Sequence, residues 1–356
     1  MVKKIFRYAT LGIQAVFKSI KVYGKPVHAQ IELTTLCNYN CKSCPRLAVL
    51  NNKFKNMPFD QFKKIVEQIN PLKITLSGLG EPLLHPDIFK ILSYLNHKKI
   101  FVRLTTNGSL ITELTAKKLI ALKLGLLNVS IDAATQSTYG KVRNNKSLDT
   151  VKQNILKLNE LKKESNSSFP QLRTSFVIQR DNFREMKEFI DFTQELGITD
   201  ISFQPLAFHF IKNREGKLVG NMQKDLLLKE LNRAYYHSLS CKVNTNLKSI
   251  IADFHDYWEN YSGGEVTGTF CIKPWISVYI TVDGDIKPCC CLVSKEGTFG
   301  NFKTNNFSNI WNSIKYQNLR KTIKKSGGPF TSCKHCISNK IPDFVKSTCL
   351  FFVGVL

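Results

Sequence analysis

The sequence predicts an α/β protein with a parallel sheet, followed by a small cysteine-rich domain. Three observations predict this fold class. Residues 28–206 alternate short strand-like segments with helical patterns, which favours a parallel sheet with right-handed crossovers. The 356 residues are enough for one large domain and a smaller one. From Cys271 onward the sequence pattern changes to short strands, turns and clustered cysteines.

The first element expected is a helix within residues 3–22. Apolar residues such as Ile13, Val16 and Ile20 alternate there with lysines and an arginine, which is typical of a basic amphipathic helix. Such a helix can lie on a membrane surface, but docking onto its own domain is the more common arrangement. We therefore expect docking within the protein, with membrane contact as the less favoured alternative.

Six strands and five helices are expected next. The helical patterns fall at about 59–70, 86–97, 113–124, 138–163 and 182–196, and Gly197 closes the last of them. The strands are expected at Ala29–Thr34, Lys73–Ser77, Phe101–Thr105, Asn128–Asp132, Arg173–Ile178 and Asp200–Pro205. Periodicity does not separate an open sheet from a curved partial barrel. In both, a ligand site is expected at the carboxyl ends of the strands.

The rest of the chain divides into a bridge and a cysteine-rich end. A helical segment near 222–240 lies in the expected bridging region, 207–265. The complete division predicted is 1–27 for the N-terminal helix, 28–206 for the core domain, 207–265 for the bridge and 266–356 for the small domain.

The chain is strongly basic, which bears on the class of partner that it binds. Lys and Arg number 51 against 27 Asp and Glu, which gives a net charge of +24. An acidic partner would be attracted by this charge, but the lysines are spread along the whole chain. Since there is no arginine-rich tract and no RNA-binding motif, we expect no nucleic-acid partner.

Eleven cysteines without a clear signal peptide favour a reducing compartment and metal ligation over disulfides. No apolar run is long enough to span a bilayer. A cytoplasmic location is therefore expected.

The first cysteine group is Cys37, Cys41 and Cys44, spaced C-x3-C-x2-C directly after the first strand. Structural zinc and ordinary four-iron clusters each take four protein ligands. Three thiolates on one loop would leave one iron of a 4Fe–4S cluster open to a small molecule. A zinc site completed by Cys241 or a distant histidine is the alternative.

Polar motifs follow the next three strands. Gly80 and Glu81 come after the second strand, where a glycine lets the backbone approach a ligand closely. Asn107 lies in a turn after the third strand. Ser130 and Asp132 end the fourth strand, and period-two geometry places them on one face.

In this order, the motifs of residues 28–206 resemble those of the radical S-adenosylmethionine (radical SAM) enzymes. The resemblance implies a partial (β/α)6 TIM-like barrel with a 4Fe–4S cluster on the three cysteines. It also implies S-adenosylmethionine contacts at Gly80, Glu81, Asn107, Ser130, Asp132 and Arg143. One departure is Ser43, which stands where the family often has an aromatic residue beside the adenine; Tyr39 is a candidate replacement.

The second cysteine group surrounds a predicted hairpin at Asp283-Gly284. Four of its cysteines are able to close around one iron–sulfur cluster or one zinc ion. Together with Gly300-Asn301, Trp311 and Arg320, the group resembles the SPASM or twitch extension of radical SAM enzymes. The resemblance implies one auxiliary 4Fe–4S cluster held by Cys271, Cys289, Cys333 and Cys336.

The remaining cysteines are expected to be buried or idle thiols. They are Cys241, Cys290, Cys291 and Cys349. The spacing from Gly284 favours Cys289 as the ligand over its two neighbours in the sequence.

The resemblance implies an enzyme that reductively cleaves S-adenosylmethionine to a 5′-deoxyadenosyl radical, which abstracts hydrogen from a substrate. An external electron donor such as flavodoxin or ferredoxin would reduce the cluster. About 28 residues precede the first strand, too few for the leader-binding domain of many peptide maturases. Oxidation or modification of a small molecule is therefore favoured over a peptide or protein substrate. A non-catalytic iron–sulfur electron-transfer or regulatory protein is the alternative from a different class.

Overall fold

A computed structural model describes residues 2–50, 53–206, 223–261, 271–292 and 297–326, together with Phe330 and Cys333. Its strands form one ten-stranded sheet in the order β10-β9-β8-β1-β2-β3-β4-β5-β6-β7. The strands are β1 (His28–Ile31), β2 (Lys73–Leu76), β3 (Phe101–Thr106), β4 (Leu126–Ser130), β5 (Gln171–Ile178), β6 (Asp200–Pro205), β7 (Asn244–Thr245), β8 (Ser277–Ile280), β9 (Asp285–Lys287) and β10 (Gly300–Asn301).

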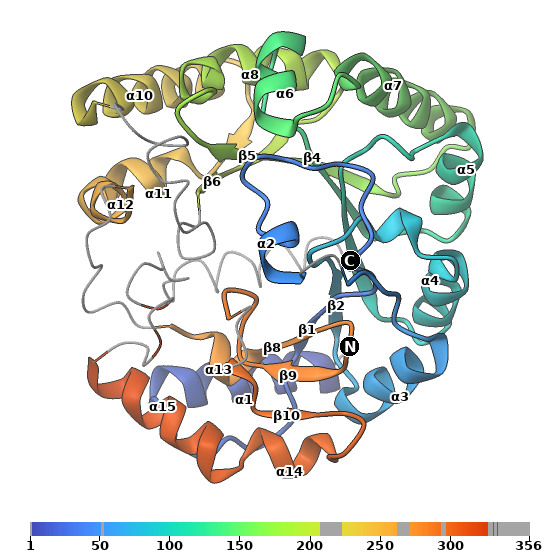
Figure 1. The fold of residues 1–356 in the computed structure, drawn as a ribbon, viewed down its shortest axis with the longest axis vertical. Helices are drawn as coiled ribbons and strands as arrows, with labels where there is room; N and C mark the ends of the chain where they lie inside the picture. Colours follow the sequence, from blue (N-terminus) through green and yellow to red (C-terminus); the bar gives the residue numbers. More distant parts are fainter. Residues whose placement is uncertain are drawn as a thin grey trace.

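Most of the helices lie around the outside of this curved sheet, as Figure 1 shows. Strands β1 to β6 are all parallel, so the predicted α/β partial-barrel class is confirmed. The helices are α1 (Val2–Val16), α2 (Arg46–Leu50), α3 (Phe59–Ile69), α4 (Ile88–His97), α5 (Glu113–Ala121), α6 (Gln136–Arg143), α7 (Leu148–Glu164), α8 (Met186–Glu195), α10 (Lys224–Ser240), α11 (Leu247–Ala252), α12 (Phe254–Tyr261), α13 (Lys273–Ile276), α14 (Phe307–Trp311) and α15 (Ile314–Ser326). None of those in the described ranges is long and apolar enough to cross a bilayer.

The single helix expected over 138–163 is wrong, because two helices occupy this stretch. Helix α6 ends at Arg143, and Asn144 follows in the left-handed conformation with φ of 50°. Asparagine tolerates this conformation better than most residues. The break matters for the site, because it leaves Arg143 in the last turn of α6.

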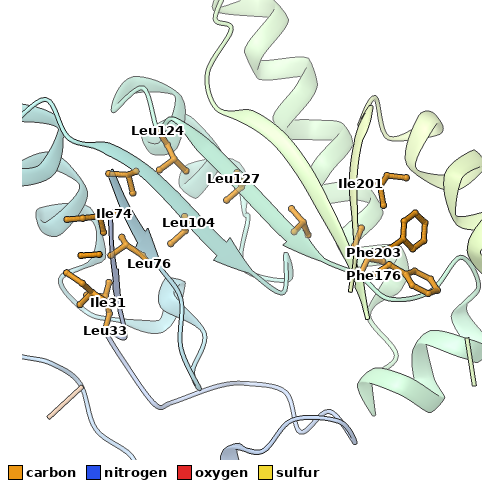
Figure 2. Close-up of a cluster of buried hydrophobic side chains, with 14 of the residues drawn as sticks. Ile31, Leu33, Ile74, Leu76, Leu104, Leu124, Leu127, Phe176, Ile201 and Phe203 are labelled. Carbon is orange, nitrogen blue, oxygen red and sulfur yellow. The ribbon is translucent and has the colours of Figure 1, made fainter. Parts of the chain in front are cut away.

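The strands carry apolar and polar side chains on opposite faces. In β3, Val102 and Leu104 are buried, whereas Arg103 and Thr105 line an internal cavity. This is the period-two alternation of a strand. Figure 2 shows the apolar set from several strands gathered as one core, including Ile74, Leu76, Leu104, Leu127, Phe176 and Phe203. The opposite, polar faces leave room for a ligand.

Helix α1 packs against the protein through one face. Tyr8, Leu11 and Ala15 are buried there, and the Arg7 guanidinium donates to the Lys25, Pro26 and Asn70 carbonyl oxygens. The other side of this N-terminal segment exposes Phe6, Ile13 and Phe17. The helix ends at Val16, earlier than the predicted residue 22.

The cysteine-rich region joins the barrel sheet directly. Strand β8 pairs in parallel with β1, and β8 and β9 form the hairpin expected at Asp283-Gly284, where Gly284 has φ of +85°. Residues 262–270, just before this region, and 207–222 of the predicted bridge lie outside the described residues. The bridge adds a short strand, β7, to the other end of the sheet.

Glu32 fixes this junction from inside the protein. Its carboxylate accepts hydrogen bonds from the Leu79 amide at 2.8 Å, the Val282 amide at 3.2 Å and the Tyr279 hydroxyl at 3.0 Å. The side chain is 2% exposed, and burial raises the pKa of its carboxyl. One carboxylate therefore holds together the first strand, the turn after the second strand and the hairpin.

We expect Glu32→Ala to lower the free energy of unfolding by about 2 to 4 kcal/mol, because the buried Val282 amide, the partly buried Leu79 amide and the Tyr279 hydroxyl lose their acceptor. Tyr279→Phe removes only one of the three donors and serves as the control, with an expected loss of about 1 kcal/mol. Denaturant unfolding followed by circular dichroism measures both. Equal losses in the two variants would contradict the role assigned to Glu32.

Candidate active site

A cavity of about 620 Å³ lies inside the curved sheet. The three cysteines of the first group line it, and so do Cys289 and Cys290 of the second group. The six residues predicted to contact S-adenosylmethionine line the same cavity: Gly80, Glu81, Asn107, Ser130, Asp132 and Arg143. The structure therefore brings most of the predicted site into one space.

The cysteine loop is held by polar side chains within residues 38–46 and by one side chain of the turn after β3. The Arg46 guanidinium donates to the Tyr39 carbonyl oxygen at 3.0 Å and to Asn40 Oδ1 at 2.5 Å. The Asn107 side-chain amide donates to Asn38 Oδ1 at 2.8 Å. These contacts fix the loop to the turn after β3, so the three thiols are positioned by the fold.

The three thiols are suited to soft metal ligation. Burial raises the pKa of Cys37 to about 11 and raises the pKa of Cys44. An Arg143 guanidinium nitrogen lies 3.8 Å from Cys41 Sγ. A raised pKa works against the free thiolate, so the protons leave only when a bound metal displaces them. Three thiol ligands on one loop, with a cation beside one of them, fit an iron–sulfur cluster.

Glu81 and Gly80 form a rigid turn beside the cysteine loop. The Glu81 carboxylate accepts from the Asn107 amide at 2.7 Å and from the Leu83 amide at 3.1 Å. Burial raises the pKa of this carboxyl. A Cβ on Gly80 would collide with the carbonyl oxygens of Thr34 and, at 2.5 Å, of Leu36. Only glycine fits here, because the backbone of the segment preceding Cys37 comes so close.

Asp132 and Arg143 form a buried ion pair next to the cysteines. The Asp132 Oδ2 and Arg143 Nη2 atoms are 2.7 Å apart, and the side chains are 4% and 12% exposed. The other Asp132 oxygen accepts from the Val177 amide at 2.7 Å. Both carboxylate oxygens thus have protein partners, and Asp132 orients Arg143 toward Cys41.

Tyr39 and Ser43 both line the cavity. Tyr39 is 4% exposed and lies edge-on to Tyr139, with ring centroids 6.5 Å apart. Its hydroxyl contacts Ser147 Oγ and accepts from the Tyr139 hydroxyl at 3.2 Å. These contacts fix the Tyr39 ring in place.

The second cysteine group is also assembled around one centre. Burial raises the pKa of Cys271 and of Cys333, and the charge of nearby Cys291 contributes to both shifts. Cys289 and Cys290 line the cavity, and both also lie within hydrogen-bond reach of Cys291. Proximity therefore favours Cys291 as a partner of Cys271 and Cys333, whereas the spacing from Gly284 favours Cys289. Cys336 and Cys349 lie outside the described residues.

Cys241 lies apart from both cysteine groups. Its sulfur is 3.4 Å from His237 Nε2, and the pair lies beside Asp191 where α10 packs on α8. The alternative zinc site made of the first three cysteines and Cys241 therefore has no support in this structure.

Sequence reasoning missed several residues that build the site. They are Glu32, Asn38 and Arg46, which hold the turn and the loop, and Lys73 and Arg103, which line the deep part of the cavity. The available signal was strand alternation: both Lys73 and Arg103 occupy inward positions of predicted strands.

Comparison with known proteins identifies the two parts of the chain. Residues 31–202 match the model of the radical SAM superfamily, and residues 271–337 match that of an iron–sulfur cluster-binding domain, SPASM. The chain is therefore a member of the radical SAM superfamily with a C-terminal SPASM domain, as the motifs predicted. These domains imply S-adenosylmethionine and 4Fe–4S clusters as the cofactors.

Individual relatives are distant but span most of the chain. The tungsten-containing aldehyde ferredoxin oxidoreductase cofactor-modifying protein of Pyrococcus furiosus is 24% identical over 89% of this chain and 89% of its own length. The mycofactocin maturase MftC of Mycolicibacterium smegmatis is 24% identical over 97% of this chain and 85% of its own. The crystal structure of Streptococcus suis SuiB bound to precursor peptide SuiA has a TM-score of 0.66 at 17% identity, covering 86% of this chain and 69% of SuiB.

We expect Gly80→Ala to reduce iron incorporation, because the added methyl group displaces the backbone that leads into Cys37. Iron per chain after anaerobic reconstitution measures this. The control is Gly140→Ala on helix α6, where a Cβ would meet no atom closer than 3.8 Å and alanine favours the helix. Full iron content in Gly80→Ala would show that the close approach is not needed.

Proposed function

We propose that this chain is an enzyme that reductively cleaves S-adenosylmethionine and abstracts hydrogen from a small molecule, with help from one auxiliary 4Fe–4S cluster. The observation that carries the proposal is the shared cavity. Cys37, Cys41 and Cys44 line it together with Cys289 and Cys290, so a substrate inside it would lie near both cysteine groups.

The residues that would hold the cofactors follow from the contacts above. Cys37, Cys41 and Cys44 would ligate three irons of a 4Fe–4S cluster, which supplies the electron for S-adenosylmethionine cleavage when it is bound and reduced. Gly80 lets the backbone approach the cofactor closely, because it has no side chain. Glu81 places a carboxylate where an ammonium group would bind. Arg143, oriented by Asp132, supplies a cation for a carboxylate. Asn107 and Ser130 provide polar contacts on the same wall.

The cavity volume supports a small-molecule substrate. About 620 Å³ lies within the range of roughly 300 to 1,000 Å³ that is usual for small-molecule sites. The relatives named above include a cofactor-modifying protein and a maturase. A peptide or protein substrate is therefore the alternative, and an external donor such as flavodoxin or ferredoxin would supply the electron.

We expect the reconstituted protein to release 5′-deoxyadenosine when it is incubated anaerobically with S-adenosylmethionine and dithionite. Liquid chromatography with mass detection measures the product. The Cys37→Ala, Cys41→Ala and Cys44→Ala variants should release none, because the cluster loses a ligand. Cys241→Ala is the matched control and should keep the activity of the parent, since Cys241 lies outside the cavity. A parent protein without product would support the non-catalytic electron-transfer alternative.

We further propose that residues 266–356 hold the auxiliary cluster, with Cys271, Cys333 and Cys336 as ligands. The reconstituted parent should contain about eight irons per chain, and Cys333→Ala should lose about four of them. The fourth ligand is Cys289 according to the spacing from Gly284 and Cys291 according to its proximity to Cys271 and Cys333. Comparing Cys289→Ala with Cys291→Ala distinguishes the two, because only the variant that lacks the true ligand should lose iron. Unchanged iron with a loss of zinc in Cys333→Ala would overturn the auxiliary cluster.

A further inference from the structure

Two adjacent strands of the core each place a cation in the deep part of the cavity, which Lys273 also lines. Lys73 lies on β2 and Arg103 on the adjacent strand β3, and both side chains line the cavity. Within the described ranges of the chain, neither forms an ion pair with a carboxylate. The Lys73 ammonium lies 5.6 Å from the centroid of the Phe101 ring, and Arg103 Nε is buried with no hydrogen-bond partner among the described residues.

The described surroundings of Lys73 and Arg103 do not fully neutralise their charges. Burial and the charge of Arg173 lower the pKa of Arg103 to about 10, and the Asp200 carboxylate, which offsets this in part, is already bound by Arg173 at 2.5 Å. Burial together with the charges of Arg103 and Arg173 lowers the pKa of Lys73 to about 8. His28 beside them is neutral, since burial lowers its pKa to about 3. An uncompensated buried charge is destabilising, so a ligand of opposite charge would stabilise this part of the fold.

This cationic group is separate from the expected S-adenosylmethionine contacts. Lys73 stands four residues before Ser77 along the chain, which corresponds to roughly 13 Å at about 3.3 Å per strand residue. The Gly80–Glu81 turn and the cysteine loop lie beyond the carboxyl end of that strand. Arg143, the cation at that end, is already paired with Asp132.

A hydrogen-bond acceptor without a partner lies close by. Asn128 on β4 is 1% exposed and lines the cavity. Its side-chain amide donates to Ser175 Oγ at 3.3 Å, but its Oδ1 atom accepts no hydrogen bond from the part of the chain that the structure describes. Asn128 pairs with Thr105, two residues beyond Arg103 on β3. Among the described residues, Arg103 Nε and Asn128 Oδ1 thus lack hydrogen-bond partners and Lys73 lacks an ion pair, and all three side chains line the same cavity. Buried polar atoms usually have partners.

We propose that the deep end of the cavity binds an anionic group of the substrate, a carboxylate or a phosphate, through Lys73 and Arg103. Asn128 Oδ1 accepts a hydrogen bond from a hydroxyl or amine group next to that anion. That the anion belongs to the substrate rests on the proposed function, whereas the anion site itself rests only on these three side chains. The substrate class is then an anionic, hydroxylated or aminated small molecule, bound with its charged end away from the cysteine loop.

Binding of simple anions tests the site without turnover. Reconstituted protein is titrated by calorimetry with inorganic phosphate and, separately, with succinate at constant ionic strength, with and without S-adenosylmethionine and with no reductant. We expect one site for at least one probe, and the preferred probe distinguishes phosphate from carboxylate. Lys73→Met and Arg103→Met should each weaken it by at least about tenfold, the loss of one charge-assisted hydrogen bond. Lys63→Met, at an exposed lysine on α3, should not change it.

Thermal unfolding distinguishes a variant that has lost the anion site from one that no longer folds properly. Without anion, Lys73→Met and Arg103→Met should melt at the same or a higher temperature than the parent, because a repulsive charge is removed. At the same probe concentration, the bound probe should raise the melting temperature of the parent more than that of either variant. Absence of binding by both probes, equal binding in the variants, or a large drop in their melting temperatures would each overturn the site. Anion binding does not require cleavage of S-adenosylmethionine. The binding result would therefore stand even if the protein released no 5′-deoxyadenosine.

Discussion

The parallel pairing of β1 with β8 is the constraint on which the rest of the site depends. His28 to Ile31 are aligned with Ser277 to Ile280, so the hairpin of the SPASM domain continues the sheet of the radical SAM core. Glu32 then binds the amides of both parts at the end of β1. Because of this junction, Cys289 and Cys290 reach the cavity that the first cysteine loop also lines. Two cysteine groups about 250 residues apart in sequence therefore share one space.

The same sheet explains how a charged site is kept inside a folded protein. Alternation directs the apolar side chains to the helices and the polar ones to the cavity. At the carboxyl end, each buried charge has a partner: backbone amides bind Glu81, and Asp132 pairs with Arg143. Such pairing offsets the cost of burial. At the deep end, Lys73 and Arg103 lack partners of this kind among the described residues, and the contrast between the two ends motivates the anion site.

Much of this arrangement could be predicted from the sequence, because its signals are local. The order of strands and helices, the cysteine spacing and the turn at Gly80 are each contained in a few neighbouring residues. The pairing of β1 with β8 has no local signal, since it joins segments far apart in the chain. The break at Asn144 depends on a backbone conformation that apolar periodicity does not encode. The ion pair of Asp132 with Arg143 and the proximity of Cys291 to Cys271 likewise require the fold.

The central claim is that one cluster is open to S-adenosylmethionine and the other is closed. Electron paramagnetic resonance of the reduced protein, recorded with and without S-adenosylmethionine, tests it most directly. The account predicts two cluster signals in the parent, of which one changes when S-adenosylmethionine is added. It also predicts that a variant with Cys37, Cys41 and Cys44 all replaced by alanine keeps one signal that does not respond. A response in that variant, or the loss of every cluster signal from it, would contradict the account.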